Sequence, residues 1–120
     1  MKSYRELIVW KKSIILSKEV YILTEKFPKT EIFGVTSQMR RAAVSIPSNI
    51  AEGYTREHKK EYIHFLSIAF GSGAELETQM MIVKELNFCS EKEYQKLISL
   101  LDEIMRMLNK LISSLRISIS

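Results

Sequence analysis

The chain has 120 residues and a mass of 14.0 kDa, which suits a single domain over residues 1–120. Its composition, 46% hydrophobic and 27% charged, is close to the globular average and excludes an intrinsically disordered chain. Only 4 glycines and 2 prolines are available for turns, too few for an all-β domain of this length. The formal net charge of +4 permits a polyanionic partner without requiring one.

Cysteine content and apolar run length set the expected compartment. Cys89 is the single cysteine, so no internal disulfide can form, as is usual in a reducing compartment. Together with 2 histidines it offers too few soft ligands for a structural zinc site, and we expect no cofactor. The longest apolar runs, such as 7–10, are too short for a signal peptide or a membrane-spanning helix. We therefore expect a cytoplasmic protein of bacterial type without a membrane partner.

The first two helices are predicted from capping residues and apolar spacing. Ser3 and Glu6 form a capping-box pattern, so the first helix is expected to begin at Ser3 and to end near residue 26, ahead of Pro28. Apolar residues at helical spacing predict a second helix from Ser37, and Pro47 lies inside this pattern. Because proline lacks the N–H and crowds the carbonyl four residues earlier, we expect a kinked but continuous helix, with a nearby asparagine or serine supplying hydrogen bonds.

The third helix is expected to begin between Thr55 and Lys59 and to end at Asn87, a residue suited to a left-handed C-cap. Gly71 and Gly73 fall in the middle of this helix. A glycine inside a helix costs about 1 kcal/mol relative to alanine, so we interpret both as sites where another backbone approaches closely.

The fourth helix opens with a second capping-box pattern at Ser90 and Glu93. Residues 116–120 carry no pattern that requires a structure, and we expect this tail to fray. Helices of about 25 residues, each about 37 Å long, joined by short loops predict an all-α fold, an antiparallel up-down-up-down four-helix bundle.

Known catalytic constellations of helical bundles do not fit this sequence. A di-iron site needs two Glu-x-x-His motifs, and only Glu61 with His64 is present. HEPN ribonucleases carry an arginine and a histidine separated by four to six residues, and neither His58 nor His64 has an arginine at that spacing. Cys89 has no histidine nearby in the sequence to activate it as a nucleophile. We expect a protein that is not an enzyme and that binds no metal.

Glu75 and Glu77 lie two residues apart, about 200° around a helix, and so cannot pair on one face. One of them must face a neighbouring helix or a partner chain. We interpret this residue as a buried or half-buried carboxylate bridged to Arg40 or Arg41, rather than as a catalytic group.

Positive charge is concentrated in the first half of the chain. A solvated polar face would explain any one group of these cations, and contact with nucleic-acid phosphates would explain all of them. The candidates for nucleic-acid binding are Lys11, Lys12, Lys18, Arg40, Arg41, Arg56, Lys59 and Lys60.

The first helix carries more apolar residues than one core-facing stripe needs. The runs 7–10, 14–16 and 20–23 each cover most of a helical turn. Either this helix is buried on two sides within the bundle, or it presents an apolar face to another subunit. In a bundle of 120 residues we favour the second alternative.

A longer block carries a family resemblance. Residues 37–53 read SQMRRAAVSIPSNIAEG, and further similarity lies at Leu7, 9–12, 27–29, 65–66, 71–72, 75–77 and 107–108. On these residues the chain closely resembles the four-helix bundle proteins encoded within intervening sequences of bacterial 23S ribosomal RNA genes. It is also similar to the related accessory proteins of diversity-generating retroelements.

The resemblance implies a small bundle that assembles into a homopentameric, barrel-like ring. The retroelement accessory proteins bind nucleic acid and a reverse transcriptase through a basic surface, which implies the same role for the pairs 11–12 and 40–41. Pro47, Asn49 and Gly53 look architectural, with Asn49 placed to cap carbonyls that Pro47 frees. We therefore expect a non-catalytic homo-oligomer that binds RNA or DNA, with or without an unidentified protein partner. The alternative is a structural or protein-interaction scaffold with no nucleic-acid role.

Overall fold

The computed structural model describes residues 3–119, and within them it contains four long helices and two short 3-10 turns but no strand. The all-helical prediction is therefore confirmed. The 3-10 turns cover Tyr4–Glu6 and Lys29–Glu31. The long helices are α1 (Ile8–Thr24), α2 (Val35–Tyr54), α3 (Lys59–Glu85) and α4 (Glu91–Ile119).

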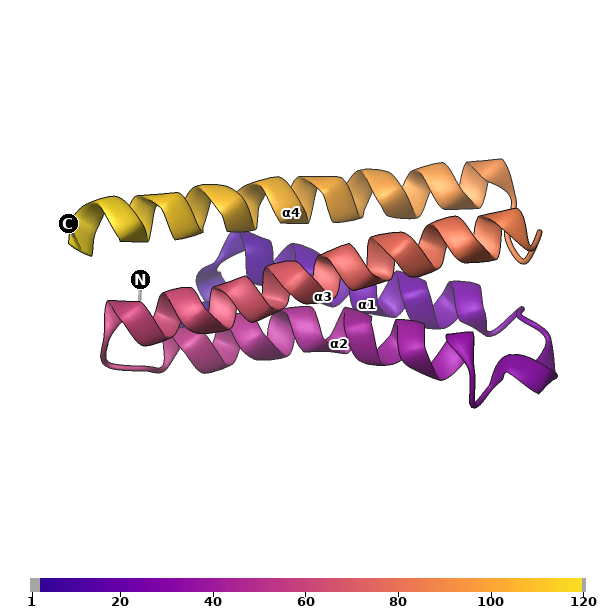
Figure 1. Cartoon of the computed structure of the whole chain (residues 1–120), viewed down its shortest axis with the longest axis horizontal. Helices are drawn as coiled ribbons and strands as arrows, with labels where there is room; N and C mark the ends of the chain where they lie inside the picture. The colour runs from indigo at the N-terminus through magenta and orange to yellow at the C-terminus, as the bar shows by residue number, and fades with distance from the viewer. Residues whose placement is uncertain (1–2, 120) are drawn as a thin grey trace.

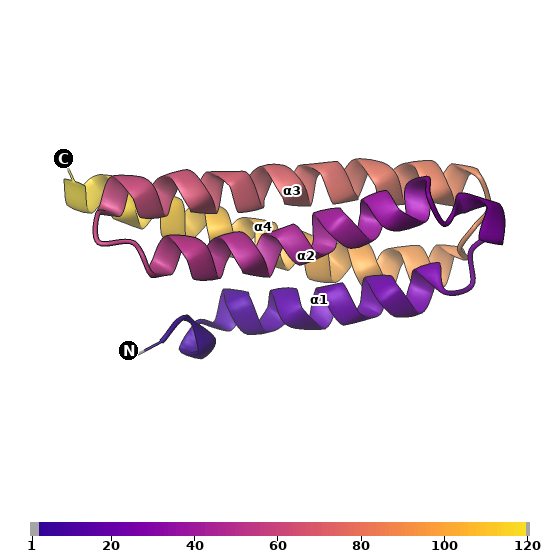
Figure 2. The same cartoon turned by 90° about the horizontal axis from the view of Figure 1, so that it is seen from below.

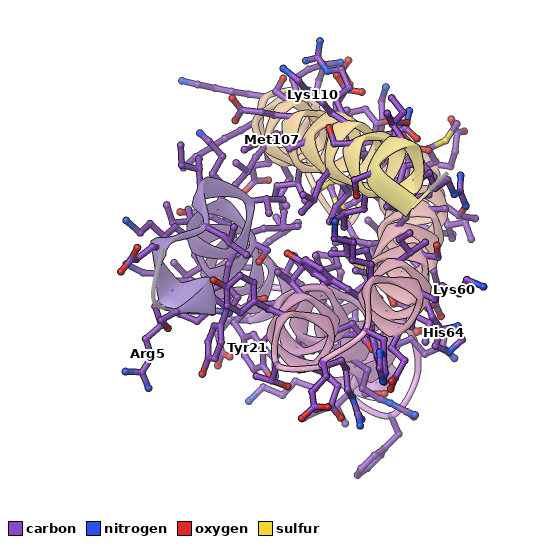
Figure 3. The ribbon with its side chains drawn as sticks, turned by 90° about the vertical axis from the view of Figure 1, so that its left-hand side faces the viewer. Arg5, Tyr21, Lys60, His64, Met107 and Lys110 are labelled. Carbon is purple, nitrogen blue, oxygen red and sulfur yellow. The ribbon has the colours of Figure 1, made fainter. Side chains whose placement is uncertain are left out.

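The helices lie side by side in an elongated body of 47 × 22 × 20 Å. Helices that follow one another in the chain run in opposite directions, and their connections alternate between the two ends (Figures 1 and 2). Seen along the long axis, α1, α2, α3 and α4 surround a common centre (Figure 3). Each helix therefore packs against two others, and α4 closes the bundle against α1.

The core consists of one apolar stripe from each helix, at the three- and four-residue spacing of a bundle seam. Its largest members are fully buried: Leu16 and Val20 from α1; Met39, Ile46 and Ile50 from α2; Leu66, Leu76, Met80 and Val83 from α3; and Leu101, Ile104 and Leu108 from α4. Because each helix buries a single stripe, the remaining apolar residues of α1 lie outside the core.

The capping predictions for α3 and α4 are confirmed. Asn87 has φ 62°, the left-handed conformation expected after a helix end. The amide of Glu93 donates to Ser90 Oγ at 3.1 Å, and the amide of Ser90 donates to Glu93 Oε1 at 2.9 Å. A hydrogen bond from Lys26 and the one from the Ser90 amide lower the pKa of Glu93 from 4.5 to about 2.

The predicted start of the first helix is wrong. Ser3 Oγ accepts from the amide of Arg5 at 3.1 Å and caps only the short 3-10 turn. Leu7 is then extended, with φ −69° and ψ 125°, and α1 begins at Ile8. The break lets the ring of Tyr4 pack edge-on against Trp10, with 5.4 Å between ring centroids. This aromatic contact is a tertiary feature that the capping pattern does not encode.

The other end of the chain also differs from expectation. Helix α4 continues through residues 116–119, where the sequence carries no pattern that requires a helix. The last residue of the expected tail, Ser120, lies outside the described residues.

Pro47 lies inside α2, which is one continuous helix, as predicted. The carbonyl that loses its amide partner because of Pro47 belongs to Ala43. The single hydroxyl proton of Ser17 on α1 is shared between this carbonyl, at 3.1 Å, and the carbonyl of Ser13 in its own helix, at 3.0 Å. Asn49 instead donates to the carbonyl of Ser45 at 2.8 Å and to its hydroxyl at 2.9 Å. The compensating bond therefore comes from a neighbouring helix. A kink at Pro47 stays a prediction.

The glycines of α3 have different roles. A Cβ at Gly73 would collide with the thioether of Met105, so a side chain from α4 fills the space beside this glycine, and a close approach of the two backbones there stays a prediction. A Cβ at Gly71 would meet nothing within 4 Å, and the same interpretation is wrong for that residue. On α2, a Cβ at Gly53 would lie 2.8 Å from Cβ of Phe65, so this glycine allows α2 and α3 to approach each other.

Ser17→Ala should destabilise the protein because it leaves the Ala43 carbonyl without its donor, a cost of about 1 kcal/mol. In a Pro47→Ala background the residue at 47 regains an N–H that bonds this carbonyl, so the same change should cost less. Ser13→Ala is the control, because Ser13 bonds only within α1, to the carbonyl of Trp10. Urea unfolding measures this double-mutant cycle, and equal costs of Ser17→Ala in both backgrounds would contradict it.

Stability should fall in acid through Glu93. Its folded pKa is lowered to about 2, so its stabilising contribution is present above the unfolded value and disappears as the pH falls through 2. Glu93→Gln should flatten the dependence of the unfolding free energy on pH between about 4.5 and 2. Lys26→Gln should remove much of the same dependence, since Lys26 is the largest cause of the shift. Parallel pH profiles for the three proteins would contradict this account.

Candidate nucleic-acid interface

The eight predicted cations lie in three places on the bundle. Lys11, Lys12 and Lys18 lie on α1, and Arg40 and Arg41 lie near the beginning of α2. The remaining three surround the turn from α2 to α3, in the order Arg56, Lys59, Lys60. The structure therefore does not join the eight residues into one patch within a single chain.

The lysines of α1 differ in their contacts. Lys12 Nζ lies 3.0 Å from Glu103 Oε1 of α4, and this ion pair holds α1 against α4. Lys11 and Lys18 are exposed on the outer side of α1, and neither forms an ion pair with another residue of the described part. Lys12 is thus engaged within the bundle, while Lys11 and Lys18 are available to a partner.

Arg40 is committed to the packing of α2 against the end of α1. Its Nε donates to Thr24 Oγ1 at 2.8 Å, and its Nη2 lies 3.3 Å from Glu25 Oε2. The guanidinium also stacks over the ring of Tyr21, 4.6 Å from the ring centroid. These contacts leave Arg40 little capacity to bind a phosphate.

The expected bridge from Arg40 or Arg41 to Glu75 or Glu77 is wrong. Both carboxylates are exposed, and no ion pair joins either of them to an arginine within residues 3–119. Arg40 instead pairs with Glu25, because the end of α1 lies closer to it than α3 does. Arg41 is exposed and lines a cavity of about 750 Å³ together with Glu75.

The turn between α2 and α3, called here the basic turn (Arg56, Lys59 and Lys60), collects three exposed cations within five positions. Lys59 Nζ donates to the hydroxyl of Ser118 at 2.9 Å, and Lys60 points outward from α3 (Figure 3). Arg56 lies 3.3 Å from Glu52 and stacks over Phe65 at 4.9 Å. Of the three, Lys60 makes no ion pair or hydrogen bond to another described residue.

The beginning of α3 adds a helix N-terminus to the basic turn. His58 is the N-cap, and its side chain makes no capping hydrogen bond. The partial positive charge of a helix N-terminus favours anions, and here it lies beside Lys59 and Lys60. Two exposed carboxylates, Glu57 and Glu61, lie in the same stretch and offset part of its positive charge, and the cations that remain in excess suit phosphate oxygens.

The residues considered for chemistry do not gather. Cys89 is half-buried, and burial is the main reason that the pKa of its thiol is raised. His58 and His64 are exposed, and the ring of His64 packs edge-on against Phe65. Over residues 3–119 no three His, Cys, Asp or Glu side chains are grouped so that they could hold a metal ion. Among the described helices, none has the length and apolar character to cross a membrane.

Comparison with known proteins gives a family and a fold. Residues 5–110 match the family model described as 23S rRNA-intervening sequence protein. A solved structure that is similar is a protein of unknown function from the S23 ribosomal protein family of Bacteroides thetaiotaomicron, with a TM-score of 0.80 and 21% identity. The match covers 88% of this chain and 98% of that one, and at this identity it shows the fold alone. No curated protein is significantly similar to the chain.

The two neighbouring arginines should respond differently to substitution. Arg40→Gln removes charged hydrogen bonds to Thr24 and Glu25 and should lower the free energy of unfolding by about 1–2 kcal/mol. Arg41→Gln, the matched control, removes an exposed side chain and should change it by less than about 0.5 kcal/mol. Urea titration followed by circular dichroism makes the comparison. Equal decreases would show that Arg41 also supports the fold.

Proposed function

This chain belongs to the 23S rRNA-intervening sequence protein family, and we propose that it is a non-catalytic, homo-oligomeric bundle that binds the backbone of RNA or DNA. The observation that carries the proposal is the basic turn, where three exposed cations lie beside an uncapped helix N-terminus. Such a site offers positive charge and N–H donors to phosphates, but no group placed to contact the edges of the bases. Binding should therefore depend on charge more than on sequence.

Assembly would multiply this site. In a ring whose axis runs along the bundles, every copy presents the same end to the same rim, so the basic turns would recur around it. Five copies, the number that the family resemblance implies, would carry five times the +4 charge of one chain. A ring of phosphate contacts would bind more tightly than one turn alone, through avidity.

A structural or protein-interaction scaffold is the second candidate. It is favoured by the intramolecular contacts of Lys12, Arg40 and Arg56, which occupy three of the eight cations. It is also favoured by Phe33, whose side chain is 94% exposed between α1 and α2, as a residue that contacts another protein would be. In this alternative the protein assembles but does not need nucleic acid.

Binding to a structured RNA at low salt should fall steeply as salt rises, because each phosphate contact releases counterions. The double variant Lys59→Gln with Lys60→Gln should weaken binding and lower the slope of log K against log salt by about 0.7–0.9 for each phosphate that is no longer neutralised. Fluorescence anisotropy with a labelled RNA hairpin and a DNA duplex measures both quantities.

The matched control is Lys92→Gln with Lys110→Gln, which removes the same charge from exposed positions on α4. Lys110 lies on α4, away from Lys60 (Figure 3). If both double variants weaken binding equally, the basic turn is not the site. If the unmodified protein binds neither RNA nor DNA at low salt, the scaffold replaces the nucleic-acid proposal.

A further inference from the structure

The outer side of α1 carries an apolar stripe that the core does not use. Ile8, Ile15 and Ile22 are 60%, 51% and 52% exposed. They are seven residues apart, close to two helical turns, so they form one row along the helix. Lys11 and Lys18, both exposed, lie between them on the same side. We call this row of three isoleucines the α1 ridge.

The outer side of α2 exposes two short side chains, Val44 and Ser48, between the longer exposed side chains of Arg41 and Glu52. Two cavities, of about 750 and 450 Å³, follow α2 along this side. Tyr21 borders the first from α1, and Glu75 borders it from α3. We call these two cavities together the α2 groove.

The α1 ridge and the α2 groove are of opposite shape and lie on different sides of the bundle. Viewed along the axis, α1 and α2 occupy different corners, and Tyr21 lies between them (Figure 3). A two-fold dimer could join ridge to groove only if both lay on one face, because each copy then offers the same face to the other. A head-to-tail contact places the ridge of one copy in the groove of the next, and its repetition closes a ring when the rotation between copies divides a full turn.

We propose that the α1 ridge of each copy packs in the α2 groove of the next copy, head to tail. The proposal rests on the homo-oligomeric assembly proposed above and specifies its contact. Large side chains on one helix and short ones on the other are what close helix packing requires. The occupant of the groove is thus a second copy of this chain.

The contacts within one copy fix the register of this packing. The hydroxyl of Ser17 bonds the carbonyl of Ala43 at 3.1 Å, so these two residues lie at the same level along the bundle. The hydroxyls of Ser45 and Ser72 are 2.8 Å apart, which sets the level of α3 in the same way. In a ring whose axis runs along the bundles, rotation from one copy to the next leaves the position of each residue along that axis unchanged. The level of Ile15 is then the stretch of α2 that follows Val44.

The same register brings opposite charges together. Lys18 is one residue beyond Ser17, and Glu75 is one turn of α3 beyond Ser72, so both lie near the level of Ala42. Lys18 makes no ion pair in the described part of its own chain, and the carboxylate of Glu75 has only Gln79 as a neighbour, at 3.5 Å. Arg41 also lines this stretch of the groove. A charge exchange at Lys18 and Glu75 leaves Arg41 unchanged, so it tests the Lys18–Glu75 pair alone.

Size exclusion coupled to light scattering tests the contact. The unmodified protein should give a ring mass, five times 14.0 kDa for a pentamer. Ile15→Lys destroys the ridge and Ser48→Arg fills the groove, and each should run at 14.0 kDa with an unchanged circular dichroism spectrum, because both residues are exposed. Met81→Lys, at an apolar position 56% exposed on α3, is the control and should leave the ring intact.

Mixing the two monomeric variants gives the decisive result. Each retains one half of the contact, so a head-to-tail interface predicts a one-to-one heterodimer of twice 14.0 kDa and nothing larger. A mixture that stays monomeric would overturn the proposal. Rings that survive Ile15→Lys or Ser48→Arg would also overturn it, while leaving homo-oligomeric assembly and RNA binding in place.

A charge exchange tests the register. Lys18→Glu should weaken association by about tenfold or more, and Lys18→Glu with Glu75→Lys should restore it. No rescue would overturn the register assigned to the contact. If the unmodified protein itself runs at 14.0 kDa, both this contact and the assembly proposed above are wrong, and RNA binding by the basic turn is then judged by its own assay.

Discussion

The carbonyl of Ala43 cannot accept the usual hydrogen bond from the residue four positions on, because that residue is Pro47, which has no N–H. A buried carbonyl without a hydrogen bond is costly, and Ser17 of α1 supplies a donor at 3.1 Å, shared with the carbonyl of Ser13. This bond is made between helices, so it ties α1 and α2 at one level and holds them close. The proline inside α2 thereby fixes the position of α1 relative to α2.

Other small residues extend this close packing along α2. Ser45 meets Ser72 on α3, and Gly53 leaves room for Phe65. Two cavities open to the surface along the outer side of α2, where the short side chains of Val44 and Ser48 are exposed.

The packing of the helices also decides which cations form contacts within the bundle and which stay available. Arg40 binds Thr24 and Glu25 and so fastens α2 to the end of α1, while Lys12 fastens α1 to Glu103 of α4. The cations that remain available are at the edges of the bundle, above all in the basic turn. The basic residues of one copy are thus distributed over separate positive sites. Only assembly of several copies could bring these sites into one surface.

Local patterns in the chain were enough to predict the four helices, the capping box at Ser90 and Glu93, the left-handed Asn87 and the core stripes. These features depend on residues a few positions apart, so local spacing is enough to predict them. The excess of apolar residues on α1 was also visible, although spacing alone cannot tell which of them face solvent.

Features that depend on contacts between separate elements became visible only in the folded bundle. Ser3 caps a short turn because Tyr4 packs on Trp10, and Arg40 binds Glu25 rather than Glu75 because the end of α1 is the nearer neighbour. The donor for Ala43, the cavities along α2 and the separation of the cations follow from how the helices are placed against one another. The spacing of residues along the sequence does not predict that placement, because residues far apart in the chain become neighbours only when the bundle forms.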